Sequence, residues 1–280
     1  AFEKLPYLGL SKTYSANQQT PDSAPTMSAI ITGVKTNEGV LSLNQAIKRT
    51  ETNQAVIHAN ATQTMLEKAE AHGLVTGIIS TARITHATPA ATYAHIPNRD
   101  WENDAMLPAE AVKSGIKDIA LQLLEQGKMA KGNGIEVVLG GGRKEFLPKA
   151  AHDPEYPEKQ GERKDGRNLI EAYIAQHNAE YVWNKNQFDA IDPKTTKRLL
   201  GLFQPSHMQY EHDRLSDKAG EPSLAEMTSK AIDVLSSHNK GYFLMVEAAR
   251  IDHASHAGNA YRTFSETAAL SDAVKAAMAK

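Results

Sequence analysis

Carboxylate and imidazole side chains gather directly after one apolar segment of the sequence. The apolar run over 242–246 predicts a buried strand, and it is followed by Glu247, Asp252, His253 and His256. Asp252 and His256 are four residues apart, so they share one face of a helical turn. A carboxylate and an imidazole held in this way suit Zn²⁺. Because open α/β sheets bind ligands at the carboxyl ends of their strands, this segment predicts a metal site.

A serine near the N-terminus has two compatible interpretations. The residues Pro21-Asp22-Ser23-Ala24 precede a segment with helical character. A Ser or Asp in this position is typical of a helix N-cap, whose oxygen accepts hydrogen bonds from free backbone amides. A serine there can also act as a nucleophile on an anion such as phosphate, because a helix N-terminus carries positive partial charge. The residues alone leave both interpretations open.

Further polar residues follow another predicted strand. His86 and Thr88 come a few residues after an apolar run and can present ligand atoms at its carboxyl end. The alternative for His86 is an ordinary hydrogen-bonded histidine. Arg99 is a candidate anion clamp through its forked guanidinium. The alternative for Arg99 is a surface ion pair with a neighbour such as Asp100.

Strand-like and helix-like segments alternate, which favours an α/β fold with a largely parallel central sheet flanked by helices. The predicted strands cover 74–81, 135–139 and 241–246, and the helices before them cover 61–72, 108–126 and 223–237. Another helix should begin near Ser23. The three glycines at 140–142 predict a structural turn, because they match no phosphate-binding pattern. Long polar segments near 151–167 and 203–221 predict insert-like loops in one domain over 1–280.

Composition excludes several classes of protein and site. The chain of 280 residues has a formal net charge of -2, which argues against a dedicated nucleic-acid binder. It contains no run of about 18 apolar residues, so no transmembrane segment is predicted. It also contains no cysteine, so a metal must be held by His, Asp, Glu or hydroxyl groups.

Taken together, these residues resemble the alkaline phosphatases, in the branch that animal enzymes share with some bacterial relatives. The resemblance spans nearly the whole chain, and no Gly-x-Ser-x-Gly elbow favours a serine hydrolase instead. The blocks that carry it occur in the family's order: 2–14, Pro21-Asp22-Ser23, 33–37, His86-Ala87-Thr88-Pro89, Tyr93-Ala94-His95, Arg99-Asp100-Trp101, Gly140-Gly141-Gly142-Arg143 and Arg250-Ile251-Asp252-His253.

The resemblance implies hydrolysis of small phosphate monoesters through a phosphoserine, with two zinc ions and one magnesium ion. Ser23 would be the nucleophile and a ligand of the second zinc. Asp22 would position Arg99, and Arg99 and His253 would face the phosphate. The remaining metal-site residues would be Asp252 and His256 on the first zinc, Glu247 and Thr88 on magnesium, and His86 near magnesium.

A calcium site, a homodimer and an exported location, periplasmic or extracellular, are also implied by the resemblance. The positions that match the calcium site are Glu155, the backbone of Phe203, Gln204 and Glu221. The family has a carboxylate where Gln204 stands, so we expect calcium to bind more weakly here.

Both ends of the sequence look cut, because the family's other metal ligands would lie before Phe2 and after Lys280. Within the chain, the first zinc would have two protein ligands and the second only Ser23, whereas zinc takes about four. Two alternatives therefore stay open: a segment or degenerate relative that folds without catalysis, and a related phosphodiesterase.

Overall fold

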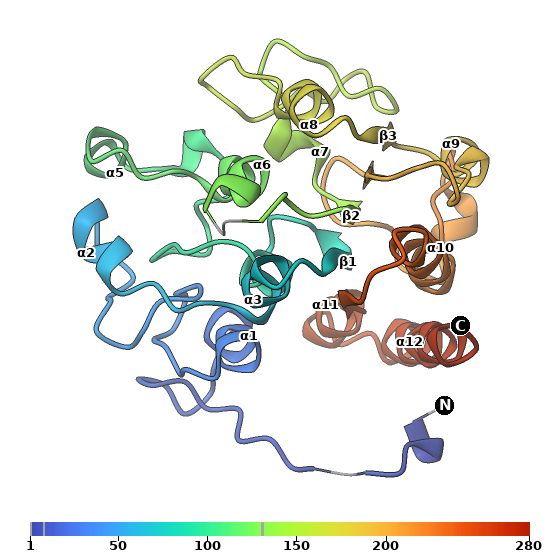
Figure 1. Ribbon diagram of the computed structural model, residues 1–280, viewed down its shortest axis with the longest axis horizontal. Helices are drawn as coiled ribbons and strands as arrows, with labels where there is room; N and C mark the ends of the chain where they lie inside the picture. Colours follow the sequence, from blue (N-terminus) through green and yellow to red (C-terminus); the bar gives the residue numbers. More distant parts are fainter. Residues whose placement is uncertain (1, 8, 130–131) are drawn as a thin grey trace.

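The computed structural model describes residues 2–7, 9–129 and 132–280, so Leu8 of the first family-like block lies outside the described residues. Its centre is a five-stranded sheet with the order β3-β4-β2-β1-β5, in which every pair of neighbours is parallel. Parallel strands must be connected through crossovers, and helices supply most of them here. The predicted α/β fold with a largely parallel sheet is confirmed (Figure 1).

The strands are β1 (Val75–Arg83), β2 (Val137–Gly141), β3 (Glu180–Val182), β4 (Leu199–Leu202) and β5 (Tyr242–Glu247). The α-helices are α1 (Ser23–Thr32), α2 (Gln54–Ala59), α3 (Met65–Ala71), α4 (Ala87–Ala90), α5 (Ala109–Lys113), α6 (Ile119–Met129), α7 (Arg143–Phe146), α8 (Leu169–His177), α9 (Lys185–Ala190), α10 (Leu224–Ser236), α11 (Arg250–His256) and α12 (Ala260–Met278). Short 3-10 helices are η1 (Phe2–Lys4), η2 (Asp104–Met106) and η3 (Arg214–Ser216).

Two apolar layers cover the two faces of the sheet. Successive strand residues point to opposite faces, so Ile78 and Val138 belong to one buried cluster, whereas Ile79 and Leu139 belong to the other. The first cluster includes residues of α1, α3, α6 and α8, and the second includes residues of α9, α10 and α12. Figure 1 shows these two sets of helices on opposite sides of the strands. Because both faces are covered, the three strands with near-continuous apolar runs could be predicted from the sequence.

The predicted elements are largely confirmed, with one error. Strands over 74–81, 135–139 and 241–246 correspond to β1, β2 and β5, and a helix does begin at Ser23. The single helix predicted over 108–126 is wrong, because the chain forms α5 and then α6. Gly115 between them has φ +80°, a left-handed conformation that interrupts a helix. Asp118 then accepts a hydrogen bond from Leu121 N in the first turn of α6.

The turn predicted over 140–142 is confirmed only at Gly142, whose left-handed φ of +105° leads the chain into α7. Gly140 and Gly141 belong to the end of β2, and Gly141 brings a loop against the sheet. A Cβ on Gly141 would lie 2.1 Å from the carbonyl oxygen of Ser206, so a side chain there is excluded. Met208 N donates to Thr81 O over 3.0 Å. These contacts fix the segment around His207 at the ends of β1 and β2.

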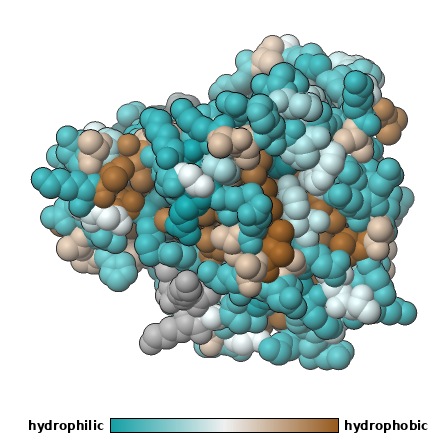
Figure 2. Space-filling view, turned by 90° about the horizontal axis from the view of Figure 1, so that it is seen from above, coloured by the Kyte–Doolittle hydropathy of each residue, from teal (hydrophilic) through white to brown (hydrophobic). Residues whose placement is uncertain are grey.

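The surface carries separate apolar side chains among polar ones. Figure 2 shows a largely hydrophilic face with several apolar patches. Exposed apolar residues include Tyr261 and Phe264 of α12. Among the residues that the structure describes, no helix is both long enough and apolar enough to cross a membrane.

A nearly buried ion pair ties α3 to the segment after α4. His95 Nε2 lies 2.8 Å from Glu67 Oε1, and His95 Nδ1 lies 2.8 Å from Ser42 O. Burial alone would lower the pKa of His95 and raise that of Glu67. Their mutual hydrogen bond and attraction outweigh it, so the pKa of His95 is raised and that of Glu67 is lowered. Both groups therefore favour the charged pair.

We expect Glu67→Gln to lower the free energy of unfolding by about 3–5 kcal/mol, because it leaves a buried charge without its partner. The contribution of Glu67 should disappear as pH falls through its lowered pKa. The contribution of His95 should disappear as pH rises through its raised pKa. Urea denaturation between pH 3 and 9 measures both changes in the free energy of unfolding. His58→Gln is the control, because His58 is exposed. Equal pH profiles for wild type and Glu67→Gln would contradict this assignment.

Candidate functional site

Most of the predicted site residues meet at one edge of the sheet. His86 follows β1, while Glu247 ends β5 and is followed by α11 with His253. Because β1, β2, β4 and β5 run in parallel, their carboxyl ends lie at the same edge. His207, in the loop after β4, also lies here.

Asp22 joins the start of α1 to Arg99. One carboxylate oxygen of Asp22 accepts from Ala24 N over 3.2 Å, so Asp22 is the N-cap of α1. The same oxygen lies 2.7 Å from Arg99 Nη1. Gly39 holds both residues, since Gly39 N donates to Asp22 and Arg99 N donates to Gly39 O. Ser23, the first residue of α1, is thereby placed next to the pair.

Glu247 offers a carboxylate that forms no ion pair in the described parts of the chain, although the charge of Arg99 acts on it from a longer distance. Its Oε2 accepts from Ser80 Oγ over 2.6 Å, and Thr88 also hydrogen-bonds to it. Burial raises the pKa of Glu247, while these hydroxyl contacts oppose that rise. A carboxylate surrounded by hydroxyl oxygens is the donor set that hard cations such as Mg²⁺ prefer. The residues present therefore fit the magnesium assignment of Glu247 and Thr88.

Asp252 and His256 lie on one side of α11, as their spacing predicts. His256 Nε2 is 3.4 Å from Asp252 Oδ1, and the two side chains are 80% and 61% exposed. Neither is committed to the core, so both can serve as zinc ligands with little rearrangement. On its own the pair supplies half of a tetrahedral zinc site.

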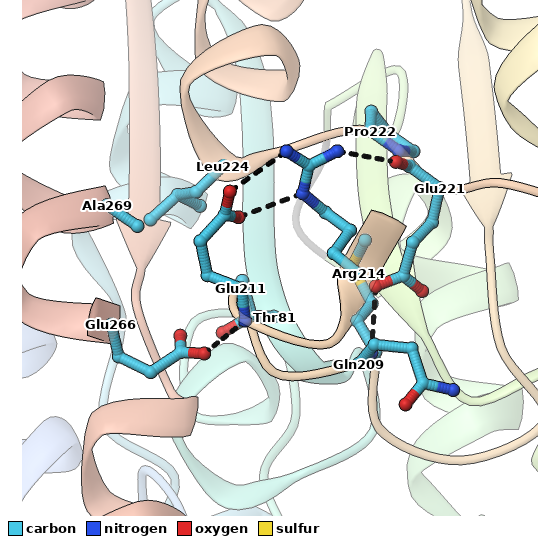
Figure 3. A pocket seen from close by; sticks show the side chains of 10 residues that line it. Thr81, Gln209, Glu211, Arg214, Glu221, Pro222, Leu224, Glu266 and Ala269 are labelled. Carbon is cyan, nitrogen blue, oxygen red and sulfur yellow. Dashed lines mark hydrogen bonds and ion pairs between the residues drawn. The ribbon is translucent and has the colours of Figure 1, made fainter. Parts of the chain in front are cut away.

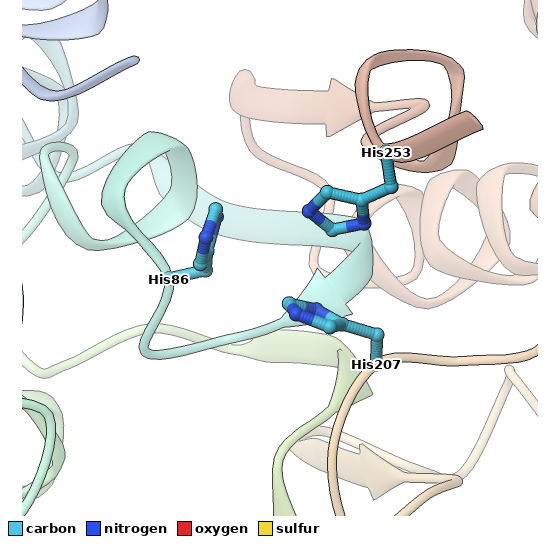
Figure 4. Close-up of side chains that lie close together, drawn as sticks. All are labelled: His86, His207 and His253. Atoms are coloured by element: carbon cyan, nitrogen blue, oxygen red, sulfur yellow. The ribbon is translucent and has the colours of Figure 1, made fainter. Parts of the chain in front are cut away.

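Three histidines converge beside Arg99 (Figure 4). His86 precedes α4, His207 lies in the loop after β4, and His253 lies in α11. One nitrogen of each ring lies within 4.8 Å of the others. Burial, together with nearby guanidinium groups, lowers the pKa of His86 and His207 to about 2 and that of His253 to about 4. All three rings are therefore neutral at neutral pH.

No role for His207 or Arg83 could be predicted from the sequence, and only the fold places them at the site. Arg83 ends β1, where its guanidinium pairs with Glu102 and lies 2.8 Å from His207 Nε2. Residues 83 and 207 are remote in sequence, so no spacing rule connects them. The loop over 203–221, which contains His207, was predicted, but the short strand before it, β4, was not. Without that strand, the sequence could not place His207 at the edge of the sheet.

The matched calcium positions lie in a separate group of carboxylates. Glu221 Oε2 and Asp217 Oδ2 are buried without hydrogen-bond partners, and Gln204 Nε2 donates to Asp217 Oδ1 over 2.8 Å. Burial and the charge of Asp217 raise the pKa of Glu221 to about 8. Glu155 also contacts Asp217 and Arg143. Crowded carboxylates with free oxygens fit a hard cation, and Asp217 is a member that the sequence did not identify.

Figure 3 shows the pocket next to this group. A cavity of about 10 Å³, close to the smallest that holds one water, lies among Glu211, Arg214, Glu221 and Glu266. Arg214 pairs with Glu211 through two contacts of 2.9 Å, and Gln209 N donates to Glu221. This pocket is too small for a substrate, so the sheet edge is the better candidate for catalysis.

Comparisons with known proteins agree with this arrangement. The family model for alkaline phosphatase matches residues 1–280. The tissue-nonspecific alkaline phosphatase of Felis catus is 42% identical over 97% of this chain and 52% of its own length. The membrane-bound alkaline phosphatase of Bombyx mori is 43% identical over 99% of this chain and 50% of its own length. The crystal structure of Thermus thermophilus alkaline phosphatase superimposes on this one with a TM-score of 0.71 at 30% sequence identity. The match covers 94% of this chain and 45% of the Thermus thermophilus chain. The chain thus spans about half the length of the curated relatives it matches.

Proposed function

The chain belongs to the alkaline phosphatase family, and on that premise we propose that it contributes the nucleophile and phosphate clamp of a phosphate monoesterase. The observation that carries the proposal is the contact of 2.7 Å between Arg99 and Asp22, at the helix end where Ser23 begins α1. A positive helix end, a hydroxyl and a guanidinium are thereby combined at one place. That combination suits a dianionic phosphate ester.

The proposed reaction has two displacements at phosphorus. Ser23 Oγ bonds to phosphorus as the bond to the leaving-group oxygen breaks, and the serine proton ends on the released alcohol directly or through water. Water then attacks the phosphoserine, returns a proton to Ser23 Oγ and releases inorganic phosphate. Arg99 keeps N–H groups free beyond its contacts with Asp22 and His86, and these can hold the non-reacting oxygens.

Metal ions would complete this site. We assign Asp252 and His256 to one zinc, Ser23 to a second, and Glu247 with Thr88 to magnesium, with His86 close to it. When bound, these ions would polarise the phosphoryl group and favour deprotonated oxygen nucleophiles. His253 would face the phosphate. We assign calcium to Glu155, Phe203 O, Gln204 and Glu221, and add Asp217 to that set.

Metal removal tests the proposal in the protein expressed from its complete reading frame. Chelation should reduce hydrolysis of an aryl phosphate by at least about 100-fold, because the covalent step depends on the cations. Zn²⁺ with Mg²⁺ should restore activity. Ca²⁺ should restore no activity. At a concentration of about 100 times its Kd, however, Ca²⁺ should add about 2.7 kcal/mol to the free energy of unfolding, which is measured as a rise in Tm. Asp217→Asn should abolish that rise.

Three outcomes would contradict these assignments. Full activity after metal removal would exclude the metal-assisted mechanism. Faster cleavage of an aryl diester than of the monoester would favour the phosphodiesterase alternative. An inactive protein that binds neither zinc nor magnesium would favour a chain that folds without catalysis.

The family also suggests wider properties, which we propose on resemblance alone. These are a homodimer, a periplasmic or extracellular location and a single domain over 1–280. Sedimentation velocity tests the first, cell fractionation the second and cooperative unfolding by two probes the third.

A further inference from the structure

We propose that the carboxyl edge of the sheet contains a second anion-binding subsite, beside Arg99, for a second phosphate or carboxylate group of the substrate. The subsite consists of Arg83, His207 and Arg250, and His253 lies between it and the phosphate that Arg99 would clamp. This inference rests on the proposed function, because it specifies which phosphate monoesters the site would favour.

Each histidine of the cluster has a guanidinium nitrogen beside it. The contacts join Arg99 Nη2 to His86 Nε2 at 3.0 Å, Arg83 Nη1 to His207 Nε2 at 2.8 Å, and Arg250 Nη1 to His253 Nδ1 at 3.0 Å. A guanidinium only donates hydrogen bonds, so a neutral ring that accepts one carries its proton on the other nitrogen. His86 and His253 therefore keep one N–H each for a further partner.

This arrangement favours an anion over a metal cation. A metal bound by the three rings would need their free lone pairs and would lie close to three positive guanidinium groups. An anion would instead accept the remaining N–H donors and would be attracted by the same three charges. The histidines therefore suit an anionic oxygen better than Zn²⁺.

His207 shows an unsatisfied arrangement that an anion would relieve. Arg83 N donates to His207 Nδ1 over 3.2 Å, while Arg83 Nη1 lies 2.8 Å from Nε2 of the same ring. A neutral imidazole accepts at only one nitrogen. When Nδ1 accepts, Nε2–H and Nη1–H are two donors that face each other without an acceptor. The two nitrogens are too close for an atom to lie between them, but an anionic oxygen bound beside both would accept from each, in addition to the bond that Nη1 donates to Ser206 Oγ over 3.2 Å.

Arg250 supplies a positive charge that forms no ion pair with a described residue, although Glu266 and Glu221 attract it from a longer distance. Arg83 pairs with Glu102 and Arg99 pairs with Asp22, whereas no carboxylate within the described ranges lies at ion-pair distance from Arg250. Its guanidinium lies 3.7 Å from the centre of the Tyr210 ring, and its buried Nε has no hydrogen-bond partner. A partly buried, unpaired guanidinium is costly unless a ligand compensates it.

The position of the subsite suggests one molecule with two anionic groups. Arg99, the phosphate clamp, touches His86, whose ring centre is 5.2 Å from that of His207 and 5.6 Å from that of His253. The two anion positions are thus separated by about one imidazole ring. We therefore assign the substrate class as bisphosphates or phosphocarboxylates rather than esters of neutral alcohols.

Isothermal titration of the metal-free chain tests this without turnover. The probes are methylphosphonate and bisphosphonates whose two groups are joined by one, two or three methylenes. At least one bisphosphonate should bind about 10-fold more tightly than methylphosphonate, because its second group is held at high effective concentration. His207→Asn and Arg250→Gln should each remove most of that advantage. The control Arg262→Gln should keep it, since Arg262 lies over the same Tyr210 ring but pairs with Asp213.

Several results would overturn the proposal. The first is that methylphosphonate and all bisphosphonates bind with equal affinity. The second is that the tighter binding of a bisphosphonate survives both His207→Asn and Arg250→Gln. The third is that two methylphosphonates bind independently while no bisphosphonate binds more tightly than one of them. Co²⁺ absorption bands of a nitrogen-bound ion that His207→Asn removes would mean that the histidines hold a metal instead. Ser23→Ala should retain the bisphosphonate advantage even if turnover is absent, which separates this inference from the proposed chemistry.

Discussion

Ser23→Ala is expected to lower the turnover of an aryl phosphate by at least about 10³-fold, because it removes the oxygen that would accept the phosphoryl group. The same change should alter the free energy of unfolding by less than about 0.5 kcal/mol. Asp22, rather than Ser23, provides the N-cap of α1, so the alanine leaves the helix end capped. Turnover and the incorporation of isotope-labelled phosphate into the protein measure the first effect, and urea denaturation measures the second.

Two further variants show whether the effect belongs to the hydroxyl of Ser23. Thr32→Ala, at the opposite end of α1, removes a hydroxyl that donates to Ser28 O and Val34 O and accepts from Val34 N. These are neighbouring backbone groups, so turnover should stay within about twofold. Asp22→Ala should instead lose about 1 kcal/mol of stability along with its cap. Turnover by Ser23→Ala within a few-fold of wild type would exclude Ser23 as the nucleophile.

The strands that could be predicted are those with the longer apolar runs, not those that are buried most deeply, since β4 is fully buried and β5 only partly so. β1, β2 and β5 have long apolar runs, whereas β3 and β4 are short and β3 begins with an exposed glutamate. Such short strands depend on their partners rather than on local pattern, so they could not be predicted. The break between α5 and α6 depends on one left-handed glycine within an otherwise helical pattern.

The predicted residues of the site differ in how far the sequence could place them. Asp252 and His256 could be paired because a helix fixes residues four apart. The contact between Asp22 and Arg99 spans 77 positions, and only the family resemblance suggested it. His207 and Asp217 were unassigned because tertiary packing, through Gly141 and the carboxylate cluster, gives them their surroundings.

Arg99→Lys is expected to lower kcat/KM for phosphate monoesters by about 10²–10³-fold and to weaken inhibition by inorganic phosphate. Arg99 Nη1 donates to Asp22 while Nη2 faces His86, so the planar fork is oriented before a ligand binds. Lysine carries one point charge on a flexible stem and cannot make both contacts while also holding two phosphate oxygens. Removal of one such donor typically costs this much. Steady-state kinetics and phosphate inhibition constants measure the effect.

Arg49→Lys is the matched control, because Arg49 also bridges two carboxylates, Glu38 and Asp100, but at the surface. Surface ion pairs contribute at most about 1 kcal/mol. The side chain of Arg49 bonds to Asn98, Glu38 and Asp100 and not to His86 or Ser23 within the described residues, so kcat/KM should stay within about twofold. Equal losses in the two variants would mean that Arg99 acts only on local folding. A loss in Arg99→Lys that appears in kcat/KM and in phosphate affinity, with Tm unchanged, would instead place its guanidinium on the phosphate.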